Sequence, residues 1–503
     1  MFANIIVDIS HEKLDRPFGY IIPKELEDKI SIGTQIVIPF GKGNREITGY
    51  VIEITDKPSF DINKMKYIIR ANEGAATVEK QLIELAWWIK KEYSCTMNQA
   101  LKTVIPVKKK IKNIQKKTIT LNISEEEAEE KILKYKKSNA KAKVRLLQEL
   151  KDIKHMSKEL VVDKLNISPS TLKALESTGD ILIEIENSYR NPVNFNNLER
   201  YDIILNEQQK AVADGIKKTM DYKKSEKANV HLIYGITGSG KTEVYMDIID
   251  KTIHDGKQAI VLIPEIALTY QTVKRFTRRF KDKVSIINSK LSAGEKYDQF
   301  ERAKRGEISI IIGPRSALFT PFENLGLIVI DEEHEGAYKS ENVPKYHARE
   351  VAAKLCNITG ATLVLGSATP SLESYFNAQT GKYKLHRLTS REKGRLAQVS
   401  VVDMRKELKN DNKSMFSMEL KQLINDRLEK KQQTMLFINR RGYAGFVSCR
   451  ECGEAVKCPH CDVTLKAHNN GKMVCHYCGY EEPIPRLCPK CGSKYLGGFG
   501  IGT

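Results

Sequence analysis

The sequence has no run of about 20 consecutive apolar residues, the length that a membrane-spanning helix requires. Its first residues also lack the basic segment that opens a secretory signal peptide, and Asp8 soon interrupts their apolar run. We therefore expect a cytoplasmic protein without a membrane partner.

Cysteine is rare over most of the chain, because eight of the ten cysteines lie between residues 449 and 491. Cys95 and Cys356 stand alone in apolar surroundings and are typical of core thiols. The other eight form four Cys-x-x-Cys pairs, and clustered thiols in the cytosol bind metal more often than they form disulfides. We predict two structural four-cysteine zinc sites, with iron–sulfur clusters as the alternative, and the spacing leaves three pairings of the motifs open. The predicted ligands are Cys449, Cys452, Cys458, Cys461, Cys475, Cys478, Cys488 and Cys491.

Acidic residues are fewer than basic ones: 63 Asp and Glu stand against 82 Lys and Arg, which gives a net charge of +19. A surplus of this size favours a polyanionic partner such as nucleic acid, since each phosphate contact releases counterions. A generally lysine-rich composition is the alternative. With 503 residues, of which 41% are hydrophobic and 29% charged, the chain is expected to be a soluble protein of about three domains.

Short alternating runs broken by glycine and proline predict a β-rich domain over residues 1–106. A helix over residues 78–93 closes this domain and carries the only two tryptophans, Trp87 and Trp88. We interpret both as core residues, with stacking on bases as the alternative. A basic linker is expected over residues 107–118, either solvated or touching backbone phosphate.

A winged-helix domain is predicted over residues 119–198. Its pattern has a capping box at Ser124, helices over 157–165 and 170–177 around a turn, and a strand over 180–185. Such domains contact either DNA or other proteins, and the residues leave both possibilities open.

From residue 201 buried strands alternate with helical segments, which indicates a doubly wound α/β domain with a parallel sheet. No internal repeat is present apart from the Cys-x-x-Cys pairs. The expected strands are residues 230–234, 259–263, 308–312, 327–330 and 362–365.

Residues 235–242 form a complete phosphate-binding loop between a predicted strand and a predicted helix. Backbone N–H groups would surround the phosphates of ATP, Lys241 would neutralise their oxygens, and the Thr242 hydroxyl would bind Mg²⁺. Asp331 and Glu332 follow the strand at 327–330 and are expected at the same sheet edge. We predict that Asp331 holds Mg²⁺ and that Glu332 orients the attacking water. The predicted ATP-binding residues of the loop are Gly235, Ile236, Thr237, Gly238, Ser239, Gly240, Lys241 and Thr242.

Four further segments resemble motifs of superfamily-two helicases. The resemblance implies that Arg315 holds single-strand phosphate and that Gln208 or Gln209 senses adenine, with Gln208 preferred. The segment Gly366-Ser367-Ala368-Thr369 would couple hydrolysis to strand movement. The four segments are residues 205–209, 264–269, 313–319 and 366–371.

Within that superfamily, nearly the whole chain resembles the primosomal replication-restart DNA helicases. The motifs that carry this resemblance are Glu-Val-Tyr after the phosphate loop, Asp331-Glu-Glu-His, Tyr346-His-Ala-Arg-Glu and Asn439-Arg-Arg-Gly. The family implies ATP-driven unwinding with 3′ to 5′ polarity, recognition of forked and single-stranded DNA, and initiation of primosome assembly. It also implies helicase-loading proteins and single-stranded DNA-binding protein as partners, and an association with the nucleoid.

The same resemblance implies residues that contact DNA. Tyr346 and Arg349 lie in a segment that corresponds to an aromatic-rich loop coupling DNA occupancy to ATP turnover. Phe18, Gly41 and Lys66 correspond to a pocket for the 3′ end of a nascent strand. Gly19 stands where relatives can have an acid, so a carboxylate contact to the terminal hydroxyl is not implied. For zinc, the family implies a nested pairing, with the first and last Cys-x-x-Cys pairs on one ion and the inner two on the other.

The expected fold class is multidomain α/β: a RecA-like P-loop helicase core with an N-terminal β-rich DNA-binding domain, a winged-helix domain and a two-zinc, eight-cysteine module. No Gln-x-x-Gly-Arg-x-Gly-Arg segment is present, and the second lobe of such motors supplies an arginine finger. We therefore expect a C-terminally truncated form that binds ATP and DNA but hydrolyses ATP poorly. The alternatives are a DNA-binding assembly platform that uses nucleotide as a conformational ligand, and an RNA helicase, which the 3′-end pocket disfavours. The expected boundaries are 199–385 for the first lobe, 386–447 for the start of the second, 448–494 for the zinc module and 495–503 for the return.

Overall fold

The computed structural model describes residues 1–58, 61–72, 77–105, 114–190, 202, 204–225, 227–264, 270–391, 397–412, 414–437, 446–468 and 471–499. The chain divides into two compact units, Met1–Gly394 and Arg395–Thr503. The expected segments 265–269 and 439–442 and the first part of the basic linker lie outside the described residues. Within the described ranges, no helix combines the length and the apolar character needed to cross a membrane.

A six-stranded sheet in the order β5-β2-β1-β4-β3-β6 forms the N-terminal domain, which confirms the predicted β-rich fold. Its inward side chains, among them Ile5, Ile36 and Val51, form a small core. The strands are β1 Phe2–Val7, β2 Phe18–Ile21, β3 Gln35–Phe40, β4 Arg45–Thr55, β5 Lys66–Tyr67 and β6 Arg70–Ala71, with 3-10 helices at Glu12–Leu14, Lys24–Leu26 and Ile62–Lys64.

Two helices, α1 Lys80–Glu92 and α2 Met97–Val104, share one hydrophobic core with the central α/β domain. Leu85 and Leu101 are fully buried in it. At the end of α1 the Tyr93 hydroxyl accepts from the backbone N–H of His347 at 3.3 Å and donates to Glu350. The N-terminal domain is therefore packed directly onto the central domain.

The two tryptophans of α1 have different surroundings. Trp88 packs against the shared core and meets Tyr93 edge to face at 5.9 Å, as expected of a core residue. Trp87 is 37% exposed, and the Lys90 ammonium lies 5.2 Å from its ring centre. The expectation of burial is therefore wrong for Trp87.

The winged-helix domain has a three-stranded sheet in the order β8-β7-β9 and four helices around the core residues Ile119, Leu146 and Leu175. The expected helices and capping box are present. The domain begins earlier than residue 119, because β7 starts at Ile114 and pairs with β9, so the end of the expected linker is a strand. The elements are β7 Ile114–Leu121, α3 Glu125–Lys137, α4 Lys141–Ile153, β8 His155–Ser157, α5 Lys158–Asp163, α6 Pro169–Ser177 and β9 Ile181–Ser188.

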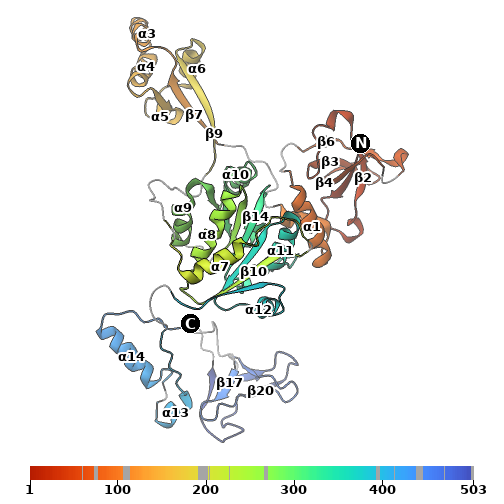
Figure 1. The fold of residues 1–503 in the computed structure, drawn as a ribbon, viewed down its shortest axis with the longest axis vertical. Coiled ribbons are helices and arrows are strands. Elements are labelled where there is room, and N and C mark those ends of the chain that lie inside the picture. Colours follow the sequence, from red (N-terminus) through yellow and green to blue (C-terminus); the bar gives the residue numbers. More distant parts are fainter. Residues whose placement is uncertain are drawn as a thin grey trace. The chain divides into compact units, whose positions relative to one another are not determined.

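A seven-stranded parallel sheet in the order β12-β13-β11-β14-β15-β10-β16 forms the central domain (Figure 1). Helices α7, α8 and α9 cover one face, and α10 and α11 cover the other together with α1 and α2. Alternate residues of each strand point to opposite faces, so that Val261 faces α8 while Leu262 faces α11. The strands are β10 Asn229–Gly235, β11 Gln258–Leu262, β12 Val284–Ile286, β13 Ile310–Gly313, β14 Leu325–Asp331, β15 Thr362–Ser367 and β16 Lys384–Leu388. The helices are α7 Glu207–Lys217, α8 Lys241–His254, α9 Tyr270–Phe280, α10 Ala293–Lys304, α11 Ala348–Thr359 and α12 Leu372–Gln379, with 3-10 helices at Lys281–Lys283, Arg315–Phe319 and Gly336–Tyr338.

All five predicted strands of this sheet are confirmed, and the two edge strands were not predicted. β16 reads Lys-Leu-His-Arg-Leu, a mixed pattern that suits an exposed edge and lacks the apolar run of a central strand. The expected boundary at residue 385 falls inside β16, so the first lobe extends beyond it.

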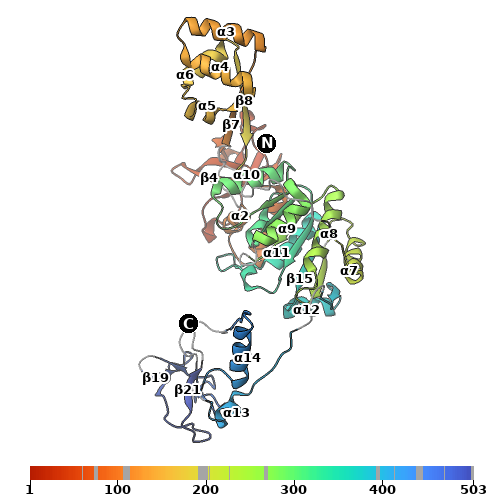
Figure 2. The ribbon, with the colours of Figure 1, turned by 90° about the vertical axis from the view of Figure 1, so that its left-hand side faces the viewer.

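The described residues of the second unit form two helices and five short strands, among them α13 and α14 (Figure 2). The strand expected over residues 434–438 is absent from 434–437, which the structure describes as irregular backbone. The elements are α13 Met404–Lys409, α14 Met418–Glu429, β17 Phe446–Cys449, β18 Lys466–Ala467, β19 Lys472–Val474, β20 Glu481–Pro483 and β21 Leu496–Phe499.

Candidate nucleotide site and zinc centres

The phosphate-binding loop joins the carboxyl end of β10 to the first turn of α8. Gly238 and Gly240 adopt positive φ angles of 80° and 78°, a region that favours glycine. At Gly235 a Cβ would lie 2.7 Å from Ser239 Oγ and 3.1 Å from Lys241 Cγ, so a larger residue would displace side chains of the loop. The helix then begins at Lys241, with Thr242 next to it, and its free N–H groups face the loop.

The groups in this loop fit a phosphate ligand. Ser239 Oγ is buried and has no hydrogen-bond partner among the described residues. Lys241 Nζ donates to the Gly235 carbonyl at 2.9 Å and lies 3.8 Å from Glu332 Oε1. A buried ammonium beside a carboxylate and an unpartnered hydroxyl is the donor set that binds phosphate oxygens.

Asp331 ends β14 and Glu332 follows it at the same sheet edge, as expected. The Tyr245 hydroxyl, one turn along α8 from Lys241, donates to Asp331 Oδ1 at 3.1 Å. Burial and the neighbouring Glu332 raise the pKa of Asp331 to about 6. A divalent cation would favour the charged form of this carboxyl group, so Asp331 fits a residue that would hold Mg²⁺, and Thr242 stays a predicted second ligand.

Glu332 has a φ angle of +46°, which is uncommon for a residue with a side chain. Such backbone conformations cluster at functional sites, where the surrounding fold holds them in place. The assignment of Glu332 to orienting water stays a prediction.

The segment Ser367-Ala368-Thr369 contacts the acidic motif through His334. His334 Nδ1 lies 2.7 Å from Ser367 Oγ, and its Nε2 lies 3.3 Å from Thr369 Oγ1. A hydrogen-bonded link of this kind is the physical basis on which hydrolysis and strand movement could be coupled.

The third acid of the motif, Glu333, is 1% exposed and binds Arg349. Arg349 Nη1 donates to Glu333 Oε2 at 2.7 Å and to the hydroxyls of Ser371 and Ser374. Both serine hydroxyls also lie within hydrogen-bond distance of Glu333. This buried cluster joins the acidic motif, α11 and α12.

The two glutamines predicted to sense adenine have different contacts in the structure. Gln209 is buried and its Nε2 donates to the Ser239 carbonyl at 3.0 Å, which supports the phosphate loop. Gln208 is half-buried and binds Thr389, with its Nε2 donating to the threonine hydroxyl at 3.0 Å. Gln208 stays the predicted base reader, because it has the more accessible amide.

The predicted DNA-contacting residues of the central domain lie mostly inside it. Tyr346 is 5% exposed and packs edge to face on Phe319 at 5.6 Å. Arg315 lies over the Tyr346 ring at 5.7 Å and donates to backbone carbonyls of Ala337 and Lys339. Arg349 is 8% exposed in the Glu333 cluster. Direct contact of these residues with DNA stays a prediction, and their observed contacts hold the loop that follows the acidic motif.

The three residues predicted for the 3′-end pocket lie close together in the N-terminal domain. Lys66 Nζ donates to the Gly41 carbonyl and to Asn44 Oδ1, each at 2.7 Å. Phe18 meets Phe40, the neighbour of Gly41, edge to face at 5.2 Å. Gly41 has a φ of 72°, so its backbone conformation favours glycine.

Several residues of these sites were not predicted. Tyr245 stands one helical turn after Lys241, so the helical period could have placed it on the same face. Arg16, whose guanidinium lies 5.3 Å from the Phe18 ring centre, and Asn44, which accepts from Lys66, were not singled out as site residues.

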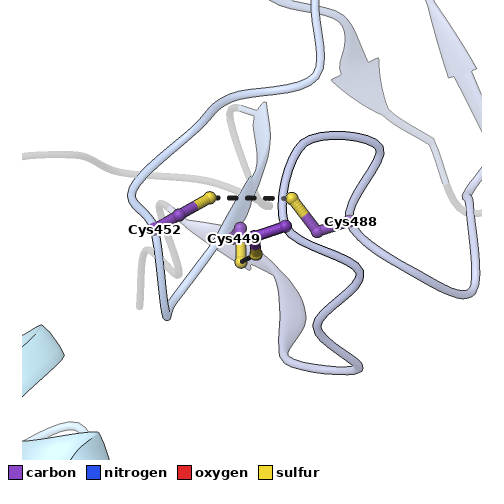
Figure 3. Close-up of side chains that lie close together, drawn as sticks. Cys449, Cys452 and Cys488 are labelled. Carbon is purple, nitrogen blue, oxygen red and sulfur yellow. Dashed lines mark hydrogen bonds between the residues drawn. The ribbon is translucent and has the colours of Figure 1, made fainter.

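The eight clustered cysteines form two groups of four, and Figure 3 shows Cys449, Cys452 and Cys488 of the first. Cys449, Cys452, Cys488 and Cys491 make one group, and Cys458, Cys461, Cys475 and Cys478 make the other. The Cys449–Cys491, Cys452–Cys488 and Cys458–Cys478 sulfur atoms are each 3.6 Å apart. Zn–S bonds of about 2.3 Å in a tetrahedron put sulfurs about 3.8 Å apart, so the spacing fits zinc and excludes disulfides. The nested pairing is confirmed.

The class of the protein follows from the central domain, whose residues 206–377 match the DEAD/DEAH box helicase family. Residues 4–106 match the 3′ DNA-binding domain (3′BD), and residues 458–483 match the PriA DNA helicase Cys-rich region (CRR) domain. The chain therefore belongs to the PriA family of replication restart proteins.

Whole-chain relatives support this membership. The chain is 36% identical to the replication restart protein PriA of Bacillus subtilis, over all of this chain and 70% of that protein. It is 33% identical to the PriA of Haemophilus influenzae, over 97% of this chain and 66% of that protein. Part of the fold also resembles RecG bound to a three-way DNA junction, with a TM-score of 0.30, 24% identity and coverage of 39% of this chain and 25% of that one. A likeness this slight adds nothing to the fold described above.

Proposed function

We propose that this protein is an ATP-dependent DNA helicase with 3′ to 5′ polarity, which recognises forked DNA and initiates primosome assembly for replication restart. The observation that carries the proposal is the phosphate loop facing Asp331 and Glu332 in a chain that also has the 3′ DNA-binding domain of the PriA family. We infer ATP and Mg²⁺ as its nucleotide and cation. The proposed partners are forked and single-stranded DNA with nascent 3′ ends, helicase-loading proteins and single-stranded DNA-binding protein, at the nucleoid in the cytoplasm.

Some residues of the nucleotide site bind the phosphates, and others act in hydrolysis. Backbone N–H groups of the loop and Lys241 bind the phosphates, and bound Mg²⁺ neutralises charge on the phosphate oxygens. Glu332, 3.8 Å from Lys241, is placed to orient the attacking water. His334 passes the state of this site to Ser367 and Thr369 through its two ring nitrogens.

Replacing Lys241 with alanine is expected to weaken ATP binding by about 10- to 100-fold, because it removes a charge-assisted contact worth about 1.5–3 kcal/mol. In a chain with a complete second motor lobe, the same change is expected to abolish ATP-dependent separation of a forked duplex. Nucleotide affinity measured by fluorescence titration and strand separation measured on a labelled fork test this.

The matched control is Lys251→Ala at the far end of α8 from the phosphate loop, where the lysine pairs with Asp255 at 2.6 Å. It should keep wild-type nucleotide affinity. If the Lys241 variant still separates forks, the helicase proposal is wrong. If it loses ATP binding and still binds forks and loads partners, the assembly-platform function is favoured.

Replacing Phe18 with alanine is expected to weaken binding to a single strand with a free 3′ hydroxyl by about 5- to 100-fold, because base stacking contributes about 1–3 kcal/mol. Fluorescence anisotropy measures the affinity for this strand and for the same strand with a 3′ phosphate. The substitution should have little effect on the affinity for the phosphorylated strand. Tyr67→Ala, which changes a 60% exposed ring on β5, is the matched variant. Equal losses on both strands would contradict a pocket specific for the 3′ end.

A further inference from the structure

The winged-helix domain has strongly segregated charge. Residues 131–148 contain seven cations and no acid. Six of them surround the turn between α3 and α4, and we call these six the basic corner. Its members are Lys134, Lys136, Lys137, Lys141, Lys143 and Arg145.

The side chains of the basic corner point away from the domain core. The apolar residues of the same helices, Ile132, Leu146 and Leu147, are buried in that core, and five of the six cations are exposed while Lys143 is half-buried over the Tyr135 ring. Helices α3 and α4 lie side by side in both views, so the end of one and the start of the other present a single surface (Figure 2).

The basic corner is not neutralised from within the protein. None of the six has an ion-pair partner in the part of the chain that the structure describes. The acids of α3 lie at its other end, where Glu129 pairs with Lys151 and Glu125 with Lys154. Like charges held this close repel one another, and a polyanion removes that repulsion.

Helix stability does not explain the cations of α4. A cation near a helix N-terminus opposes the helix dipole and costs about 0.3–1 kcal/mol, yet Lys141 and Lys143 occupy the first turn of α4. Ala140 provides no side-chain cap to that helix and no acid lies in its first turn, whereas Ser124 and Ser168 cap α3 and α6. The start of α4 is therefore unfavourable for the free helix and suited to an external anion.

Helix α6 is the helix that would enter the major groove in a helix-turn-helix, and it lacks most of the side chains that read bases. Its sequence, Pro-Ser-Thr-Leu-Lys-Ala-Leu-Glu-Ser, has one cation, Lys173, and one acid, Glu176. It has no Arg, Asn or Gln, the residues that make most bidentate contacts with base edges. A role of α6 in reading sequence is not supported by these residues.

We propose that the basic corner binds the phosphate backbone of duplex DNA without reading its sequence. Phosphate contacts give affinity and orientation, while base contacts give sequence specificity, and this surface offers only the first. The inference rests on the proposed function for the choice of DNA as the polyanion, and it adds a duplex-binding surface separate from the 3′-end pocket and the nucleotide site.

The test uses a closed dumbbell duplex, which has no strand end and little single strand, so the 3′-end pocket and the helicase domain contribute least. In the full chain, Lys134, Lys137 and Lys141 are replaced together by glutamine, which removes charge and keeps helix propensity. Affinity for the dumbbell is expected to fall at least about 10-fold near 0.1 M salt. The slope of log affinity against log salt should become shallower by about 0.9 for each phosphate that the variant no longer neutralises.

Three controls separate this surface from its alternatives. Lys151→Gln with Lys154→Gln, which changes the two paired lysines at the C-terminal end of α4, should leave dumbbell binding within about 2-fold of wild type. Lys173→Gln on α6 should do the same. The triple variant should bind a single strand with a free 3′ hydroxyl normally, which shows that the chain is folded.

Three results would overturn the proposal. One is wild-type affinity and salt slope in the triple variant, and another is a larger loss from Lys173→Gln than from the triple variant. The third is binding of polyglutamate, but not of the dumbbell, with the same lysine dependence, which would make the basic corner a surface for acidic proteins. Because Lys241→Ala does not touch this surface, failure of the helicase proposal and failure of this one are distinguishable.

Discussion

Replacing Cys458 and Cys475 together by serine is expected to lower the zinc content from two ions per chain to one. The two residues come from different Cys-x-x-Cys pairs but belong to the same group of four. With the nested arrangement only the inner ion is lost, whereas either of the other two pairings would lose both. Elemental analysis of the purified chain measures this directly.

The same double substitution is expected to unfold the small sheet of β18, β19 and β20. The core of this module is a handful of buried residues, chiefly Val447, Val456, Leu465 and Met473, besides the cysteines. Structural zinc contributes about 10–16 kcal/mol to folding in small modules, and so small a core has nothing to replace it. Limited proteolysis should cut within residues 458–483 in the variant and spare them in the wild type.

The control for both measurements is Cys95→Ala, which removes a thiol of the N-terminal domain that belongs to neither group. It should keep two zinc ions and the protease resistance of the module. Retention of two ions by the Cys458 and Cys475 double variant would contradict the assignment of these residues as ligands.

Replacing Arg349 with methionine is expected to destabilise the central domain by about 3–5 kcal/mol, because it leaves the Glu333 carboxylate buried without its cation. Urea unfolding followed by tryptophan fluorescence measures the change, since Trp88 packs on the shared core. Adding Glu333→Gln to this variant should recover part of the loss, because the uncompensated charge is then removed. Lys354→Met on the same helix, whose lysine makes no ion pair among the described residues, should change stability by no more than about 0.5 kcal/mol.

This experiment also separates two roles for Arg349. If its main contact is with DNA, the methionine variant should keep normal stability and lose DNA affinity. If its main contact is Glu333, the methionine variant should have a lower free energy of unfolding. DNA affinity should then also fall in variants of residues that do not contact the strand. Unchanged stability would show that the buried pair is not an important contact.

The features that the sequence predicted well are those fixed by neighbouring residues. The phosphate loop depends on glycines and a lysine within eight consecutive positions, and the middle residues of β11, β14 and β15 are apolar because both faces of these strands are covered. The nested zinc pairing was different: the spacing allowed three arrangements, and only the family resemblance chose among them. The edge strand β16 was missed because one of its sides is open to solvent.

The partners of buried polar groups were the least predictable part of the site. Glu333 meets Arg349, Ser371 and Ser374 only after three separate elements have packed together. Tyr346 and Arg349 were predicted as DNA contacts because they lie in a motif, and motif membership does not show which way a side chain points. The winged-helix boundary was misplaced for a related reason: lysines in β7 resemble a solvated linker until β9 pairs with them.

Because α1 and α2 pack into the central domain, the N-terminal domain and the central domain share one hydrophobic core. Asp15, three residues before Phe18, is held by Lys90 of α1 at 2.8 Å and by the backbone N–H of Met97 in α2 at 2.7 Å. Three residues after Lys90, the Tyr93 hydroxyl accepts from the backbone N–H of His347, the residue that caps α11. The N-terminal domain therefore cannot be exchanged between relatives as an independent unit, because its helices α1 and α2 form part of the hydrophobic core of the central domain. Chimeras that exchange residues 1–105 between relatives should therefore be as stable as the parent proteins only when the residues of α11 that face α1 are exchanged with them.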